Sequence, residues 1–262
     1  MQQSPPSGLL SRPDRPFTLQ RLLPADDLAE FVDYFWVVEW QLPMGESFVS
    51  ENFPHPCVHM VYEPGHSALF GPIKGHFKKT LMGQGRAIGC RFKPGLFYPW
   101  IKRPLAEMVD SQLDVAAVLS VSSQELEARL DAQLDIGQAV SEFTELLIAA
   151  CALLHPEKQQ GVLAHTIVAT MEQNTELLKV EQVCSRFQIS RRQLERLFYK
   201  HVGLSPKWVL RIYRLQQLAN EMINHPIPDW TELAHRLGYF DQAHCIRDFK
   251  QITGKTPSSY CR

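Results

Sequence analysis

The sequence lacks several features that would assign it to a membrane, secreted or disulfide-bonded class of protein. No run of 18 apolar residues occurs, so no membrane-spanning helix is predicted. The segment from Met1 to Arg15 is rich in Pro and Ser and lacks the apolar core of a signal peptide. The six cysteines form no C-x-x-C pair, and several lie in apolar stretches. They are typical of reduced, mostly buried thiols in a cytosolic protein.

Motifs of common catalytic and metal sites are missing as well. The sequence contains no G-x-S-x-G and no H-E-x-x-H, and the glycines around Gln84 are followed by neither Lys-Ser/Thr nor a helix pattern. His55, Cys57 and His59 alternate, so they share one face if this segment is a strand. That leaves open a metal site and a packed sheet face, and packing is favoured because no further ligand stands at motif spacing. We therefore predict no enzymatic activity, no cofactor and no metal.

No excess of either charge marks the whole chain, whose formal net charge is −1. The charges are nevertheless unevenly distributed. Residues 160–262 contain 14 Lys and Arg against 9 Asp and Glu, a net charge of +5, and residues 1–159 carry −6. An acidic half beside a basic half predicts two roles, with the basic half facing a polyanion.

Changes in local composition and hydrophobic pattern divide the chain into segments. Residues 1–16 are expected to be a flexible lead-in. In residues 17–115, β-branched and aromatic runs alternate with turns, and 13 of the 18 prolines precede Leu105. This segment is predicted to be a β-rich domain that senses an effector or mediates dimerisation. Residues 116–160 are predicted to be a helical connector, and residues 161–262 to be helical throughout.

Local patterns predict individual elements, some of which have two interpretations. Strands are expected at 35–38, 57–62 and 87–92, a helix start at Ser122, an apolar helix at 136–154 and a linker at 155–160. The apolar stretch from Phe143 to Leu154 suits a dimer contact and an intramolecular brace equally. Eight aromatic side chains suit an effector pocket or a core, and core packing is favoured for most of them. They are Trp36, Trp40, Phe53, Tyr62, Phe70, Phe92, Tyr98 and Trp100.

An internal repeat is the strongest signal in the sequence. Residues 190–206 align with residues 241–257 at an offset of 51. The matched pairs are Arg196 with Arg247, Phe198 with Phe249, Gly203 with Gly254, and Pro206 with Pro257. Upstream the offset is 50, so the second copy contains one added residue near Phe240. Such a length change is tolerated in a turn, and the repeat predicts two copies of one supersecondary unit.

Each copy has the pattern of a helix, a short turn and a second helix. Apolar residues from Val180 to Phe187 recur at helical spacing, and Ser190 is a suitable N-cap for the next helix. In the second copy, Gly238 suits a left-handed C-cap and Asp241 an N-cap. Two helices joined by such a turn form a helix-turn-helix unit. The helix predicted at 206–224 between the copies would be roughly 28 Å long, close to the roughly 34 Å of one turn of DNA.

The outward faces of the second helices carry side chains suited to nucleic acid. Arg and Gln form paired hydrogen bonds with guanine and adenine edges in the major groove, although each of these residues alone also suits a solvated face. The candidate DNA-binding residues are Arg191, Arg192, Glu195, Arg196 and Lys200 in the first copy, and Gln242, Ala243, Arg247 and Lys250 in the second.

With both copies identified, the last hundred or so residues resemble the AraC/XylS family of transcription regulators. The resemblance is carried by LAHRLGYFDQAHCIRDFK, from Leu233 to Lys250, and by GKTPSSY, from Gly254 to Tyr260. It implies two helix-turn-helix units joined by a long helix, with the second helix of each unit in the major groove. It also implies base reading by Arg192, Glu195 and Arg196 in the first unit and by Gln242, Ala243 and Arg247 in the second.

Three residues depart from what the resemblance leads one to expect. Glu195 is acidic, so it can accept a hydrogen bond from cytosine or repel phosphate. Ala243 cannot hydrogen-bond through its side chain and offers only contact with a thymine methyl group. Cys245 stands where a larger apolar residue is usual, so the core around it is expected to be slightly underfilled.

The N-terminal half resembles a sensor-like domain found on a subset of the same family. The matching stretches are 34–40, 54–59 and 91–97. By analogy the domain is expected to be β-rich and barrel-like, and to bind an effector or drive dimerisation. The expected fold is therefore α+β with two domains, the second being all-α with two helix-turn-helix units joined by a long helix.

These features together predict a sequence-specific DNA-binding transcription regulator. Its expected partner is double-stranded DNA, read in the major groove, and RNA polymerase, a small-molecule effector and a second copy of the chain are further candidates. One alternative is a DNA-repair alkyl-transfer enzyme targeted by the DNA-binding half. That enzyme would need a reactive cysteine in a recognisable motif, and neither Cys57 nor Cys90 lies in one. A second alternative is a sensor that acts by protein contact alone. A neutral or acidic C-terminal face would favour this alternative, whereas the C-terminal half is basic.

Overall fold

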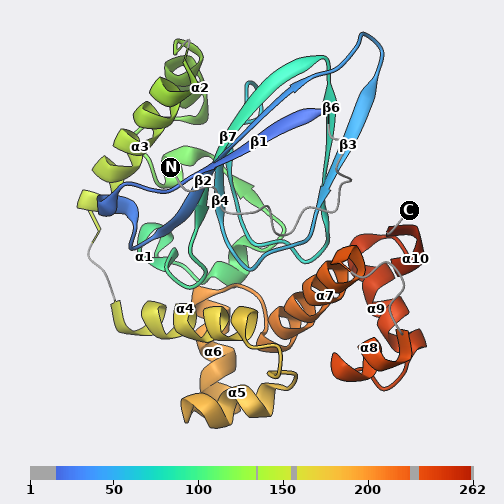
Figure 1. Ribbon diagram of the computed structural model, residues 1–262. Coiled ribbons are helices and arrows are strands. Elements are labelled where there is room, and N and C mark those ends of the chain that lie inside the picture. Colours follow the sequence, from blue (N-terminus) through green and yellow to red (C-terminus); the bar gives the residue numbers. More distant parts are fainter. Residues whose placement is uncertain (1–15, 134, 155–157, 225–229, 261–262) are drawn as a thin grey trace.

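The computed structural model describes residues 16–133, 135–154, 158–224 and 230–260. The lead-in predicted at the start of the chain lies outside these residues, apart from its last one. A β-rich part forms the upper half of the molecule in Figure 1, and a helical part lies below it. The predicted α+β architecture, with a β-rich region followed by an all-helical region, is confirmed.

Two antiparallel sheets make up the β-rich part. The strands are β1 (Phe17–Leu22), β2 (Val32–Gln41), β3 (Ser47–Asn52), β4 (His59–Tyr62), β5 (Ala68–Phe70), β6 (Phe77–Met82), β7 (Gln84–Phe92) and β8 (Gln112–Leu113). Six of them form one sheet in the order β1-β2-β7-β4-β5-β8, and β3 pairs with β6. Short helices lie at η1 (Asp26–Leu28), α1 (Tyr98–Ile101), η2 (Leu105–Met108) and η3 (Val115–Ala117).

The larger sheet is open. Within the described residues, β1 and β8 are its two edges and do not pair with each other, so the barrel-like closure expected by analogy is not found. Gly83 alone separates β6 from β7, and its φ of 55° lies in the left-handed region that favours glycine. The Trp40 indole donates a hydrogen bond to the Met82 carbonyl oxygen at 3.1 Å, which ties the β3–β6 pair to the larger sheet.

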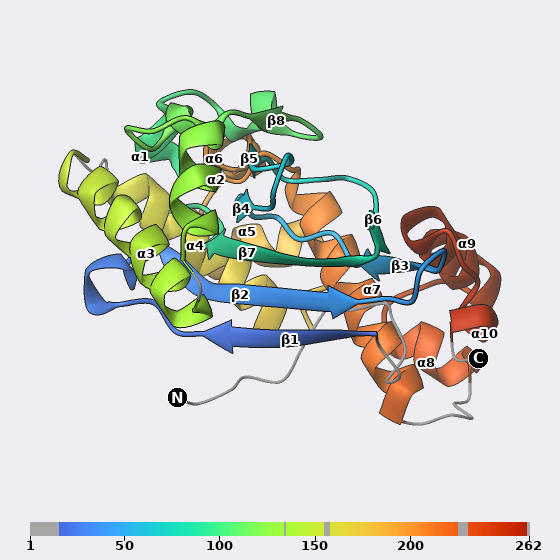
Figure 2. The same ribbon diagram turned by 90° about the horizontal axis from the view of Figure 1, so that it is seen from above.

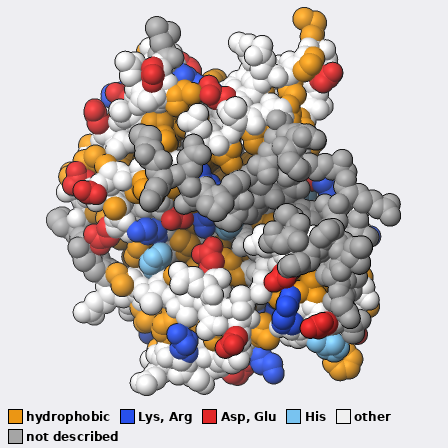
Figure 3. All heavy atoms as spheres, in the orientation of Figure 1, with side chains coloured by type: hydrophobic (Ala, Val, Ile, Leu, Met, Phe, Trp, Pro, Cys, Tyr) orange, Lys and Arg blue, Asp and Glu red, His pale blue; other side chains and the backbone are white. Residues whose placement is uncertain are grey.

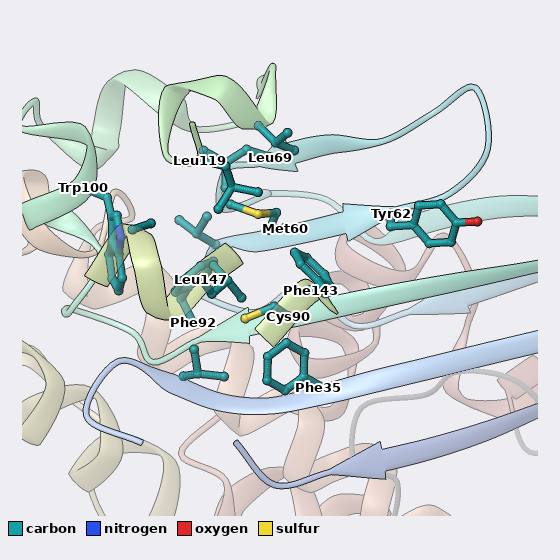
Figure 4. Close-up of a cluster of buried hydrophobic side chains, with 14 of the residues drawn as sticks. Phe35, Met60, Tyr62, Leu69, Cys90, Phe92, Trp100, Leu119, Phe143 and Leu147 are labelled. Atoms are coloured by element: carbon teal, nitrogen blue, oxygen red, sulfur yellow. The ribbon is translucent and has the colours of Figure 1, made fainter. Parts of the chain in front are cut away.

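Helices α2 (Ser123–Asp131) and α3 (Ile136–Ala152) cover one face of the larger sheet (Figures 1 and 2). Ala139, Phe143 and Leu147 recur four residues apart on α3 and are fully buried. The Phe143 ring meets Phe35 of β2 edge to face at 5.9 Å, and both lie in the cluster drawn in Figure 4. The apolar stretch that begins at Phe143 is therefore used as a brace within the chain.

Two tryptophan rings lie against glycines on the other face of this sheet. Trp36 alternates with the buried residues of β2, so its ring points away from α3. A Cβ atom at Gly89 would lie 2.0 Å from Trp36, and one at Gly85 would lie 2.3 Å from Trp40. Both strand positions therefore exclude any side chain, and the two rings fill the space above them.

The helical part contains α4 (Lys158–Gln173), α5 (Val180–Phe187), α6 (Arg191–His201), α7 (Pro206–Asn224), α8 (Trp230–Arg236), α9 (Gln242–Thr253) and α10 (Pro257–Tyr260). The long helix predicted at 206–224 is confirmed residue for residue. Residues 155–157 of the predicted linker lie outside the described chain, and α4 begins within the remainder of that linker.

Each half of the helical part has its own hydrophobic core. The first packs α4, α5, α6 and the start of α7, and the second packs the rest of α7 with α8 and α9. Phe53, which follows β3, joins the second core with only 3% of its surface exposed. Its ring meets Phe249 of α9 edge to face at 6.1 Å. An aromatic side chain from the β-rich part thus completes the core that contains Cys245.

We predict that Phe53→Ala destabilises the chain by about 3–5 kcal/mol, because it leaves a cavity between the β-rich part and α9. Denaturant unfolding of the full chain measures the loss. Val49→Ala, on the exposed side of β3, is the matched control and is expected to change stability by less than roughly 0.5 kcal/mol. Equal stability of the two variants would contradict the proposed packing of Phe53.

Candidate nucleic-acid interface

The first helices of the two repeats end in the same way. Gln188 after α5 and Gly238 after α8 are left-handed, with φ of 53° and 73°. The Ile189 amide donates to the Cys184 carbonyl at 3.1 Å, and the Tyr239 amide donates to the Ala234 carbonyl at 2.9 Å. These bonds satisfy carbonyls at the helix ends, and they follow the offset of 50 inferred from the sequence.

The second helices begin alike, at the offset of 51. The Ser190 hydroxyl accepts a hydrogen bond from the Gln193 amide at 3.3 Å, and the Asp241 carboxylate accepts one from the His244 amide at 2.6 Å. Both are N-caps, which satisfy amides that the helix itself leaves unpaired. The added residue of the second copy, Phe240, lies in the turn between α8 and α9.

Some of the candidate side chains on the outward face of α6 are exposed, and others contact residues of the same chain. Arg192, Glu195 and Arg196 are exposed. Arg191 is held by two carboxylates, Glu195 at 3.0 Å and Glu181 of α5 at 3.4 Å. The Lys200 ammonium lies 4.2 Å from the centre of the Tyr98 ring, in the β-rich part. Lys200 and Arg191 thus already have partners within the chain.

The outward face of α9 carries the four candidates of the second unit. Gln242, Ala243, Arg247 and Lys250 are all exposed. No ion pair joins Arg196 or Arg247 to another residue in the described part of the chain. The two arginines at matching positions of the repeat are therefore available to a ligand.

Helix α7 fixes the second unit relative to the first. Arg211 donates two hydrogen bonds to Asp248 of α9, at 3.1 and 3.0 Å. One turn later, Arg214 donates to the Leu178 carbonyl before α5 at 2.7 Å. The Arg214 guanidinium also lies 5.0 Å from the centre of the Tyr239 ring, in the turn of the second unit. Paired hydrogen bonds and ring stacking are the geometrically specific contacts of arginine, so they set the orientation of both units on α7.

The β-rich part also contacts the first unit. The Tyr98 ring lies 5.0 Å from the His201 ring at the end of α6. Gly203, just after α6, approaches η2 so closely that a Cβ atom there would lie 2.8 Å from the Leu105 carbonyl oxygen. With a φ of 87°, Gly203 is required both by the turn and by this approach.

A buried carboxylate joins the β-rich part to the second unit. Glu51 of β3 is 6% exposed and forms an ion pair with Lys255, just after α9. Lys78 of β6 lies 3.2 Å from the same carboxylate, and His76 lies 3.8 Å away. Burial raises the pKa of Glu51, but the hydrogen bonds from Lys255 and Lys78 outweigh this effect and hold the pKa below its usual value of 4.5.

The alternating residues His55, Cys57 and His59 do not form a metal-ligand set. The Cys57 sulfur is 3.3 Å from His59 Nε2, whereas His55 Nδ1 lies 3.5 Å from the Gln216 amide of α7. Burial raises the pKa of Cys57 to about 11 and lowers that of His59 to about 3, so both are neutral at pH 7. Among the residues that the structure describes, no group of three or more His, Cys, Asp and Glu is placed to hold a metal ion.

The five described cysteines are free thiols, as the sequence predicted. Burial raises the pKa of Cys90 well above its usual value, and raises those of Cys151 and Cys245 to about 11. A reactive cysteine requires a lowered pKa and access to solvent. Cys57 and Cys90, the two weighed as nucleophiles, are buried and lack both properties.

Four of the eight aromatic side chains singled out in the sequence are buried in a hydrophobic core, namely Phe53, Tyr62, Phe92 and Trp100. Phe92 packs edge to face on Phe97 and Trp100, and Tyr62 is fully buried. Phe70 instead lines a cavity of about 330 Å³ between β5, β6 and β8. The cavity wall also includes His76 and Lys78, two of the three side chains that reach Glu51.

Figure 3 shows one face of the molecule. Asp and Glu side chains are frequent along its left edge, over α2 and α3, and side chains of both charges are mixed on the lower part, over the helical region. No helix among the described residues is both long and apolar enough to span a membrane.

Two family models match separate parts of the chain. Residues 183–262 match a model described as a helix-turn-helix domain, and residues 20–114 match a domain of unknown function, DUF6597. The transcriptional activator RhaS of Escherichia fergusonii is 28% identical over 118 residues, which cover 44% of this chain and 42% of RhaS. An uncharacterised HTH-type transcriptional regulator of Haemophilus influenzae is 29% identical over 102 residues, 39% of this chain and 34% of that protein. The chain thus spans less than half the length of either relative.

Two solved structures are also similar to this chain. The C-terminal domain of AraT, a response regulator from Geobacillus stearothermophilus, is 26% identical and covers 37% of this chain and 84% of that one, with a TM-score of 0.32. ToxT from Vibrio cholerae is 9% identical and covers 94% of this chain and 97% of that one, with a TM-score of 0.40.

We predict that the contribution of Glu51 to stability depends on pH. A carboxyl group whose pKa is lower in the folded chain stabilises it above the unfolded pKa, and this stabilisation is lost as the pH falls through the folded pKa. The difference in unfolding free energy between wild type and Glu51→Gln is therefore expected to be largest near pH 7 and to shrink below a pH of about 4.5. Denaturant titrations at pH 7 and pH 4 measure it.

Glu125→Gln, on the exposed face of α2, is the control for general effects of removing a carboxylate. A pH-independent difference for Glu51→Gln would show that the carboxylate of Glu51 is not what stabilises this contact.

Proposed function

We propose that this chain, which carries a helix-turn-helix domain of the AraC type, is a transcription regulator that binds double-stranded DNA sequence-specifically through both units. One observation carries the proposal: Arg196 and Arg247 occupy equivalent, exposed positions on two second helices that a single rigid helix holds in tandem. Helix α7 is roughly 28 Å long, and successive major grooves on one face of DNA are roughly 34 Å apart. One chain can therefore reach two adjacent grooves.

Each candidate residue has a role set by its chemistry. Arg192, Arg196 and Arg247 are proposed to read guanine, and Gln242 to read adenine, through paired hydrogen bonds. Lys250 lacks a planar group and suits a phosphate. A further two candidates are limited by their side chains: Glu195 can accept from a cytosine amino group, and Ala243 can contact a thymine methyl group.

The two partnered candidates are assigned supporting roles. Arg191 shares its charge with Glu181 and Glu195, so it is proposed to orient the Glu195 carboxylate on the reading face. Lys200 lies against Tyr98, so it is proposed to join the first unit to the β-rich part.

The β-rich part is proposed to sense an effector or mediate dimerisation. Residues 17–115 are proposed to have this role, residues 116–160 to be a helical connector, and residues 161–262 to be the DNA-binding domain. Contacts of the β-rich part with both units support a sensing role, because a change in its shape would be transmitted to the DNA-binding helices. RNA polymerase and a second copy of the chain are proposed as protein partners, and the cytoplasm as the location.

The alternative, an alkyl-transfer enzyme targeted to DNA, receives no support from the residues it would need. The thiols of Cys57 and Cys90 are buried, and their pKa values are raised by burial. A thiol that accepts an alkyl group reacts as the thiolate and must meet its substrate.

Selection from random-sequence DNA pools tests the proposed function. The full chain is used, because Phe53 forms part of the second core. We expect one motif with two parts about one helical turn apart, and affinity that falls as the salt concentration rises. Absence of any enriched sequence, together with no dependence on salt, would reject DNA recognition.

We predict that Arg196→Ala and Arg247→Ala each weaken binding by about 1–3 kcal/mol and relax the preference at different base pairs. Binding to the selected site and to its single-base variants measures both effects. Arg129→Ala, an exposed arginine on α2, is the control and is expected to leave affinity and preference unchanged. Equal weakening on all sequences would instead assign the arginines to phosphate contacts.

A further inference from the structure

The added residue of the second turn is an exposed aromatic side chain with no packing role. Phe240 is 85% exposed, the most exposed aromatic ring among the large apolar side chains that the structure describes. It immediately precedes Asp241, the N-cap of α9. A large apolar side chain at this position commonly packs onto the fourth residue of the following helix, which here is Cys245. Its exposure shows that Phe240 does not.

The packing role is filled by the preceding residue. In the first unit, Ile189 precedes the N-cap and packs against the first core. Tyr239, its counterpart at the offset of 50, is 2% exposed and belongs to the second core. The Tyr239 ring also meets His244 of α9 edge to face at 5.3 Å. The turn is thus closed by Tyr239, and the extra residue is left at the surface beside the start of α9.

Phe240 stands at the N-terminal end of α9, the helix that carries the candidate DNA-binding residues of the second unit. The N-terminal residues of a recognition helix are those that reach base edges in the major groove. Ala243, the second residue of α9, is also exposed and apolar. Phe240 and Ala243 therefore place two apolar side chains at the end of α9 that enters the groove, and Gln242 and Arg247 supply the polar contacts.

We propose that Phe240 is a specificity-determining residue of the second unit and contacts the C5-methyl group of thymine. The inference rests on the proposed function, since it requires α9 to lie in the major groove. Thymine is the one base that presents a methyl group there, and Phe and Ala are side chains that contact it. Removing one buried methyl group from such a contact costs about 0.8 kcal/mol, which is about a fourfold loss of affinity.

Replacement of thymine by deoxyuridine tests this contact, because it removes the methyl group and keeps the base pair. The selected duplex is synthesised with each thymine of the second-unit half replaced in turn, and the full chain is titrated with each duplex. We expect wild type to bind about fourfold more weakly at one or two positions. Phe240→Ala is expected to bind the thymine and deoxyuridine duplexes equally at those positions, while its melting temperature stays unchanged.

Two further variants serve as controls for Phe240→Ala. Phe240→Leu keeps an apolar side chain and is expected to retain most of the preference for thymine. Leu153→Ala removes a similarly exposed apolar side chain at the end of α3, away from the reading faces, and is expected to behave like wild type.

Several outcomes would overturn the inference. Wild type could be insensitive to every methyl group, or Phe240→Ala could retain the full preference, which would leave the methyl group to Ala243 or another residue. A loss of affinity that is uniform over all sequences would place Phe240 against the sugar-phosphate backbone. If Phe240→Ala lowered only the number of chains bound per duplex, Phe240 would instead contact a second copy of the chain. Failure of the full chain to select any sequence would instead reject the proposed function itself.

Discussion

Helix α7 is the constraint on which the helical part depends, because both hydrophobic cores of that part are built on it. Val209, Leu210 and Tyr213 belong to the first core, and Ile212 and Leu215 belong to the second. Neighbouring residues of one helix thus point into different units, so a rotation or bend of α7 would disturb both cores together. A helix held on two sides in this way acts as a rigid spacer, which a flexible linker of the same length could not do.

The arginines of α7 add orientation to this spacing. Arg211 reaches Asp248 on α9, and Arg214 reaches both the loop before α5 and the turn of the second unit. Tertiary contacts therefore occupy some charged side chains and leave others exposed. Arg196 and Arg247 remain exposed, whereas Arg191 and Lys200, which have the same charge, lie in contacts within the chain. Charge alone does not identify the residues available to a ligand.

The β-rich part contacts each unit through a different element. Tyr98 and η2 lie against the end of α6, whereas Glu51 and Phe53 hold the end of α9. The cavity beside Phe70 shares His76 and Lys78 with the Glu51 contact. This arrangement links the shape of the β-rich part to the relative position of α6 and α9. Phe53 also contributes an aromatic ring to the second core, which contains Cys245.

The sequence by itself determined the two helix-turn-helix units, including the limits of α7, the N-caps Ser190 and Asp241, and the added residue in the second turn. These features are local. Caps and helix periodicity involve residues at most a few positions apart, so they can be recognised from a single sequence. The tertiary structure alone decided that the larger sheet stays open, that α3 braces it, and that Phe53 and Glu51 enter the second unit. Those contacts join residues as much as two hundred positions apart, such as Glu51 and Lys255. They depend on how the faces of separate elements meet in space, and no spacing along the chain records that.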